Sequence, residues 1–286
     1  MEMSPEKPSS SKKNWLVGLG IGCGAVIVIV ILLFIGGFYF VKNITKGFKD
    51  SEQITRALQA KFGKIEDFAP DPSGAVAADR IEAFLKIRES TSPARTKLEG
   101  TLGELAKREK SLSAVRYGIG MVPQMAEYFR ARGQALMDSG MGMGEYNYLY
   151  VLIYFSWMKK PPEDGPGIRM SRDMEGVHLG DRERDSADIQ KDIALRRINR
   201  TVLPMLRNQL AKIPASPAPA TKAKPSFRDA LAAEAEAMLS DAHRLPWQDG
   251  LPDVLKASFE PFRNRLEAAY SRLTNLFELS FEFQTR

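Results

Sequence analysis

The sequence contains very few of the residues on which metal and thiol chemistry depend. Its 286 residues include one cysteine, Cys23, and two histidines, His178 and His243. Because Cys23 lies inside a hydrophobic run, the rest of the chain can form neither a disulfide nor a cysteine-ligated metal site. Neither histidine has a partner at a zinc-binding spacing such as H-E-x-x-H. We therefore expect no metal and no other cofactor.

The sequence also lacks the short motifs of several common enzyme classes. There is no G-x-S-x-G elbow. Gly140, Gly142 and Gly144 have a spacing that resembles a phosphate-binding loop, but such loops lie between a strand and a helix. Here a helical pattern precedes the glycines, so we interpret them as a turn between two helices. Two catalytic carboxylates that are distant in sequence and adjacent only in the folded protein would not produce such a motif.

The excess of positive charge is small and is concentrated near the N-terminus. The formal net charge is +6, and residues 1–50 contain six lysines against Glu2, Glu6 and Asp50. Proteins that read nucleic acid concentrate Lys and Arg along one face, with aromatic residues where they hold single strands. The sequence shows no such stripe, so we expect no nucleic-acid partner.

The longest hydrophobic run predicts a membrane-spanning helix. No charged residue occurs from Asn14 to Val41, and a helix of that length, at about 1.5 Å per residue, exceeds the hydrocarbon core of about 30 Å. Trp15 and residues 38–40 place aromatic rings at both interfaces. We therefore predict a short polar tail over 1–14 and a transmembrane helix over 15–41, with membrane lipid around it. A cleaved signal peptide is the alternative, but residues 42–45 offer no small-residue cleavage site.

Four glycines in this run predict self-association. They form two overlapping small-xxx-small pairs, which let helix backbones approach closely in lipid. A homo-oligomer is therefore expected, although glycine is also common in membrane helices for other reasons. The four residues are Gly18, Gly20, Gly22 and Gly24.

The orientation signals disagree with each other. Lys12 and Lys13 favour a cytoplasmic N-terminus, whereas Lys42, Lys46, Lys49 and Arg56 favour the opposite. Long domains translocate largely regardless of such charges, and a short tail before one long domain is typical of a signal anchor. We expect an integral, single-pass membrane protein whose soluble domain is extracytoplasmic, that is, periplasmic in a bacterial-type envelope.

The rest of the chain has helical periodicity almost throughout, with no run of alternating polar and apolar residues. We predict an all-α fold in which a juxtamembrane stalk and turn over 42–74 leads to a helical bundle of about six or seven helices over 75–286. That domain includes a charged loop over 163–184 and a proline-rich linker over 213–225. The first two bundle helices are expected to pair as a hairpin. Helices are expected at 51–62, 75–88, 92–105, 112–136, 145–158, 185–210, 226–243 and 252–276.

The segment 145–158 reads EYNYLYVLIYFSWM and is apolar or aromatic on every side. Such a helix belongs in the middle of a bundle, and it is too short to span a bilayer. Aromatic faces and one carboxylate also suit a pocket for a sugar, a cation or a hydrophobic ligand. The alternative is a core in which the tyrosine hydroxyls find internal partners. The candidate ligand or partner contacts are Glu145, Tyr146, Tyr150, Tyr154 and Trp157.

Together these features favour a non-catalytic binding or scaffolding module that is tethered to the membrane of the cell envelope. Its partner would be an envelope protein or ligand. Two alternatives stay open: a membrane-anchored enzyme with a carboxylate-based site near Glu145, and an accessory subunit of a transport or secretion assembly.

Overall fold

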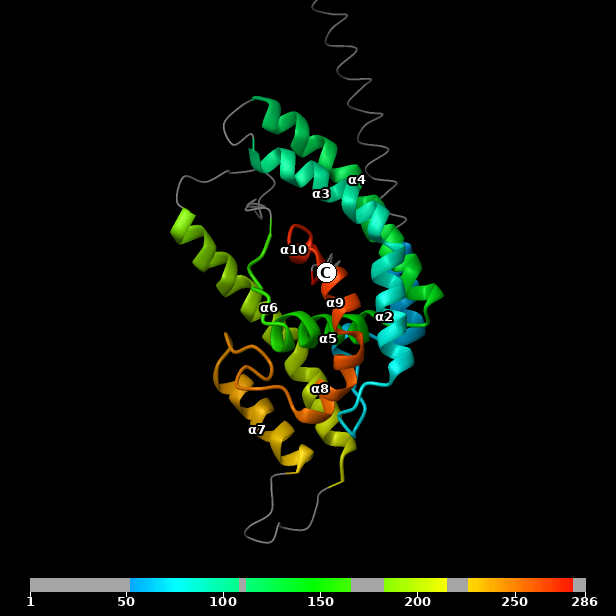
Figure 1. The fold of residues 1–286 in the computed structure, drawn as a ribbon, viewed down its shortest axis with the longest axis vertical. Helices are drawn as coiled ribbons and strands as arrows, with labels where there is room; N and C mark the ends of the chain where they lie inside the picture. The colour runs from blue at the N-terminus through cyan, green and yellow to red at the C-terminus, as the bar shows by residue number, and fades with distance from the viewer. Residues whose placement is uncertain (1–51, 108–111, 166–182, 215–225, 280–286) are drawn as a thin grey trace, which may run out of the picture. The chain divides into compact units, whose positions relative to one another are not determined.

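The structure is a computed structural model and describes residues 52–107, 112–165, 183–214 and 226–279 (Figure 1). All of them belong to one unit of the chain, Lys49–Arg286. They are helical and contain no β-strand, which confirms the predicted all-α class. Among these residues no helix combines the length and the apolarity needed to cross a bilayer. The predicted membrane helix over 15–41, with Gly18, Gly20, Gly22 and Gly24, lies outside the described residues.

The helices follow the predicted order. A helix over residues 52–62 comes first. The later elements are η1 (Ile65–Asp67), α2 (Ala78–Ser90), α3 (Ser92–Lys107), α4 (Leu112–Asp138), α5 (Met143–Tyr150), the π-helix η2 (Val151–Trp157), α6 (Glu183–Lys212), α7 (Phe227–Ser240), α8 (Asp253–Phe259), η3 (Glu260–Phe262), α9 (Arg263–Ala268) and α10 (Asn275–Glu278). Most of the predicted charged loop (166–182) and of the proline-rich linker (215–225) lies outside the described residues.

Helix α5 and its continuation η2 form the centre of the core, with α2, α6, α8 and α9 around them (Figure 1). No residue from Tyr146 to Phe155 is more than 3% exposed, which confirms the prediction of a central aromatic helix. The prediction of one regular α-helix is wrong for the second half of this segment, because η2 is a π-helix with wider turns. The Met158 amide, for example, donates to the Ile153 carbonyl at 2.9 Å, five residues back.

The turn between α4 and α5 explains the glycine-rich segment. Gly140 has φ +60°, a left-handed conformation that costs glycine little because it has no Cβ. Its amide donates to the Met137 carbonyl at 3.2 Å, and the Met141 amide donates to the Leu136 carbonyl at 3.0 Å. These two bonds are a Schellman motif, and buried Leu136 and Met141 supply its usual apolar contact. The interpretation as a helix-to-helix turn is confirmed.

Helices α3 and α4 lie side by side and enclose a second, smaller core (Figure 1). Leu98 and Leu102 of α3 meet Met121 and Met125 of α4 there. The predicted hairpin between α2 and α3 is therefore wrong. Only Thr91 separates these two helices, whereas a reversal between antiparallel helices needs a loop of about 2–5 residues.

The predicted single helix over 252–276 is also wrong, because the chain divides it into α8, η3, α9 and α10. Pro261 in η3 has no amide hydrogen with which to continue a helical ladder. Further on, the carbonyls of Leu266 and Ala269 accept hydrogen bonds from the side chains of Tyr154 and Arg88. After Ala269 the chain turns, and α10 brings Phe277 and Glu278 into the core.

Candidate functional site

Helix α5 positions Glu145 and Tyr146, which are neighbours in sequence, against different parts of the fold. The Glu145 carboxylate forms a two-pronged pair with Arg80 of α2, in which Nε donates to Oε1 at 2.6 Å and Nη2 donates to Oε2 at 2.5 Å. Arg80 Nη2 also donates to the Gly140 carbonyl at 3.2 Å. Glu145 lies in the first turn of α5, where a negative charge is favoured by the helix dipole.

The three predicted tyrosines follow each other at four-residue intervals, and each hydroxyl donates to an internal acceptor. Tyr146 donates to Glu278 at 2.9 Å, Tyr150 to Asn275 at 2.8 Å and Tyr154 to the Leu266 carbonyl at 3.0 Å. All three side chains are at most 2% exposed. They form part of the core against the segment that contains α9 and α10.

Trp157 lies at the far end of η2, in different surroundings. It is half-buried, its ring centroid lies 5.6 Å from that of Phe259, and the Arg263 guanidinium lies 4.3 Å from its ring centre. The structure therefore brings Tyr146, Tyr150 and Tyr154 together, but it places Glu145 and Trp157 elsewhere. A ligand role for these five residues stays a prediction.

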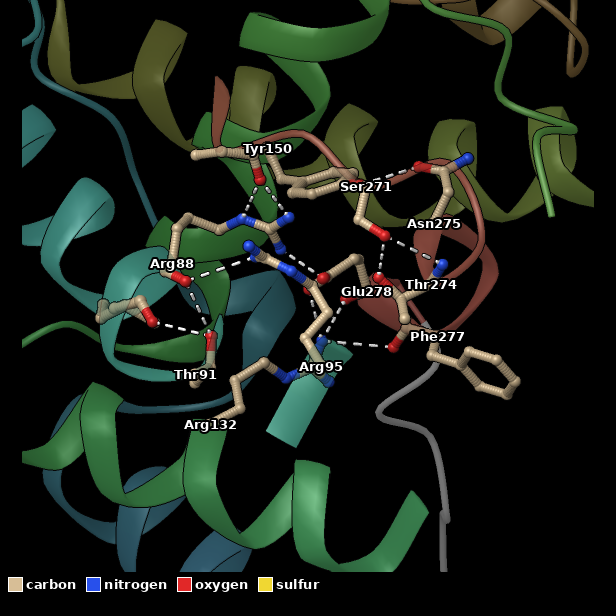
Figure 2. A network of polar contacts seen from close by, with 12 residues as sticks. Arg88, Thr91, Arg95, Arg132, Tyr150, Ser271, Thr274, Asn275, Phe277 and Glu278 are labelled. Carbon is tan, nitrogen blue, oxygen red and sulfur yellow. Dashed lines mark hydrogen bonds and ion pairs between the residues drawn. The ribbon is translucent and has the colours of Figure 1, made fainter. Parts of the chain in front are cut away.

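Sequence reasoning missed a buried group of charges, which we call the Glu278 cluster. It consists of Arg88, Tyr128, Arg132, Tyr146 and Glu278, none of them more than 2% exposed. Figure 2 shows Arg88 and Arg132 approaching Glu278. The Glu278 carboxylate accepts from Arg88, from Arg132 at 2.9 Å, from Tyr128 at 2.6 Å and from Tyr146 at 2.9 Å. These donors come from α2, α4 and α5, so the cluster joins three helices to α10.

The arginines keep Glu278 ionised in spite of its burial. Burial by itself raises the pKa of this carboxyl, but the charges of Arg88 and Arg132 and the donated hydrogen bonds outweigh it and lower the pKa to about 2. Burial raises the pKa of Tyr128 and of Tyr146, so both stay protonated donors. Carbonyl groups accept from the arginines as well: Ala269 from Arg88 at 2.7 Å, and Phe277 from Arg132 at 3.2 Å. The cluster is closed to solvent, and four side chains donate hydrogen bonds to its carboxylate.

Beside Glu145 lies a cavity of about 240 Å³, which we call the Glu145 cavity. Its lining includes Tyr148 and Leu149 of α5, Arg80 of α2 and Gln209 of α6. Gln209 is 1% exposed, and its Nε2 donates to the Asp71 carbonyl at 2.6 Å. Its Oε1 is buried and has no hydrogen-bond partner among the described residues.

The sequence does contain an indication of two residues of the Glu278 cluster. Arg132 stands three residues after Phe129 and four before Leu136, the spacing of one apolar helix face, and Arg88 continues the apolar stripe of Phe84 and Leu85. A charge at an inward position implies a buried partner, because an unpaired charge in a core is costly. Nothing local identifies Glu278 as that partner, and nothing local marked Gln209.

Among the described residues there is no group of three or more side chains that could hold a metal ion. Comparisons of the chain with protein-family models, with curated proteins and with solved structures found no match.

Proposed function

We propose that this chain is a single-pass membrane protein whose helical domain holds a partner at the cell envelope and performs no chemistry. The uncharged run from Asn14 to Val41 supports the tether, since it is long enough to span a bilayer. In this proposal residues 1–14 stay in the cytoplasm and the helical domain lies outside it. The glycine pairs in the run allow two copies to associate.

One observation carries the non-catalytic part of the proposal: the polar groups of the central helix are bonded within the core. The hydroxyls of Tyr146, Tyr150 and Tyr154 all have internal acceptors. The strongly shifted carboxyl, Glu278, is 0% exposed. A catalytic acid, base or nucleophile must lie within hydrogen-bond reach of a substrate, and these groups lie beneath other side chains. Their arrangement suits a stable scaffold.

Three large apolar side chains on α6 and α7 are candidates for the partner surface. Ile189 is 51% exposed, Ile193 49% and Leu239 52%. Ile189 and Ile193 lie one turn apart, on the same side of α6. Exposed apolar groups at neighbouring positions are typical of surfaces that bind another protein.

Purification of the full chain from detergent-solubilised membranes, with identification of co-purifying proteins, tests this proposal. We expect the wild-type chain to retain a specific envelope partner and Ile189→Glu/Ile193→Glu to lose it. Lys191→Glu is the matched control, because it lies between the two isoleucines, is exposed and changes the net charge by the same amount. A partner retained equally by all three proteins would contradict the assigned surface. Co-purification with multi-span proteins would favour the transport or secretion assembly.

The tether and its orientation are tested separately. We expect the chain to stay in the membrane pellet after alkaline carbonate washing, and a C-terminal alkaline phosphatase fusion to be active. Release of the intact chain by carbonate would refute the tether. Fluorescence from a reporter that folds only in the cytoplasm would reverse the orientation.

An anchored enzyme is the second candidate, because Glu145 lines a cavity. Arg80, however, already donates a hydrogen bond to each oxygen of that carboxylate, so a substrate would have to compete with this ion pair. Glu145→Gln separates the two functions through its effects on melting and on partner capture.

A further inference from the structure

The Glu145 cavity is mostly lined by apolar groups. Phe68 and Tyr148 form one wall, with ring centroids 5.8 Å apart. Pro70, Val76 and Leu149 line other parts of it. An apolar cavity with a few polar groups is the usual form of a small-molecule site.

The charged residues of the lining already have partners. Arg80 and Glu145 pair with each other through two hydrogen bonds. The Asp71 carboxylate accepts from the amide of Ser73 at 2.8 Å and from its hydroxyl at 2.5 Å. A charged ligand would therefore have to compete with existing contacts, so the lining favours a neutral one.

Gln209 supplies the polar group that is still incomplete. Its Nε2 is held by the Asp71 carbonyl, which fixes the amide so that Oε1 is the remaining acceptor. That oxygen is buried and has no partner in the described part of the chain. A buried acceptor without a donor is unfavourable, and a ligand with an N–H or O–H group would satisfy it.

We propose that the Glu145 cavity binds a small neutral molecule that has a ring-sized apolar body and one N–H or O–H group that donates to Oε1 of Gln209. The size of the cavity limits the body. A cavity of about 150 Å³ holds benzene, so 240 Å³ has room for a ring with a few more atoms and is smaller than the sites of drug-sized ligands, about 300–1,000 Å³. This inference does not depend on the membrane tether or on the partner surface of α6.

Indole and 1-methylindole are suitable probes, because they share a bicyclic body and only indole has an N–H donor. Binding is measured by equilibrium dialysis of the full chain, with the same detergent concentration in both chambers so that partition into micelles cancels. We expect indole to bind about threefold to tenfold more tightly than 1-methylindole, the usual net effect of one hydrogen bond. Equal affinities in the wild-type chain would overturn the proposed hydrogen bond, and binding of neither probe would overturn the site.

Two variants locate the binding. Gln209→Met keeps the length of the side chain and removes the acceptor, so it should abolish the preference for indole while 1-methylindole still binds. Ala75→Phe, at a half-exposed lining position, should fill the cavity and abolish binding of both probes even if the Gln209 variant fails to fold. Ala233→Phe, at an exposed position on α7, is the matched control and should bind like the wild type. A preference for indole that persists in Gln209→Met, or binding that persists in Ala75→Phe, would place the probe elsewhere and refute the proposal.

Discussion

Glu145 and Tyr146 are neighbours on α5, and each belongs to a different arginine–carboxylate contact. The two contacts differ sharply in their exposure to solvent. The Glu145 side chain is 18% exposed and that of its partner Arg80 is 29% exposed. The side chains of Glu278 and its partners Arg88 and Arg132 are 0% exposed. Tyr146, the residue after Glu145, belongs to the buried group. One helix therefore contacts both a partly hydrated ion pair and a dry one.

The two contacts contribute differently to the fold. Water can replace either partner of the Arg80–Glu145 pair, so the pair adds little to stability. Water cannot reach Arg88 or Arg132, so loss of Glu278 would leave desolvated charges in the core. A dry ion pair is not necessarily more stabilising than an apolar contact of the same size. In this fold the main effect of the buried Glu278 contact is to fix the position of α10.

The largest expected effect is that of Glu278→Ala, which breaks the dry contact. Removal of one partner of a buried ion pair typically costs about 3–5 kcal/mol. Glu145→Ala, the matched change in the hydrated pair, should cost about 1 kcal/mol or less. Urea unfolding of the full chain in detergent, followed by circular dichroism, measures both. Equal losses of unfolding free energy would remove the distinction between the two contacts.

The next effect sharpens the contrast between the two ends of the aromatic segment. Tyr150 is 0% exposed, so Tyr150→Ala should cost about 3–5 kcal/mol through lost burial and a new cavity. Trp157 is half-buried, so Trp157→Ala should cost less, about 2 kcal/mol. Tyr150→Phe, which removes only the hydrogen bond to Asn275, should cost about 1 kcal/mol. The reverse order in the same unfolding experiment would mean that Trp157 is the more important core residue.

Acid should weaken the dry contact specifically. The pKa of Glu278 is lowered from 4.5 to about 2 by folding. Because the folded pKa is the lower one, the stabilisation is complete above about pH 4.5 and is lost as the pH falls toward 2, by about 3 kcal/mol. We therefore expect the difference in unfolding free energy between wild type and Glu278→Gln to shrink from pH 6 to pH 2.5. A difference that stays constant with pH would show that Glu278 does not titrate in this range.

The smallest expected effect is that of Glu145→Gln, which preserves shape and some hydrogen bonding with Arg80. We expect less than about 1 kcal/mol of destabilisation and unchanged capture of the partner. Thermal melts and co-purification of this variant provide the two measurements. Normal melting with loss of partner binding, or with loss of an activity, would show that Glu145 serves a functional site, since functional carboxylates often contribute little to stability.

The apolar spacing along the sequence predicted the positions of the helices well. It predicted poorly which helices pack against each other. The apolar stripe with Ala126, Phe129 and Leu136 predicted α4, and those three residues are at most 6% exposed. The helices called α2 and α3 were placed correctly but paired wrongly, because periodicity identifies the buried face and not the neighbour that covers it. The last helix was predicted too long because the acceptors that end it are engaged by side chains of α2 and η2.

The helical class, most helix positions, the central place of the aromatic segment and the uncharged run near the N-terminus could all be read from the sequence. Each of these depends on residues within a few turns of each other, so the order of residues is enough to reveal it. The pairing of each carboxylate with its arginine, in contrast, depends on how distant segments pack. Arg88 and Glu278 are 190 residues apart, and no local pattern encodes a contact of that range. The same holds for the Glu145 cavity, in which Asp71 and Gln209 meet across 138 residues because α5 and α6 pack on the same short turn η1.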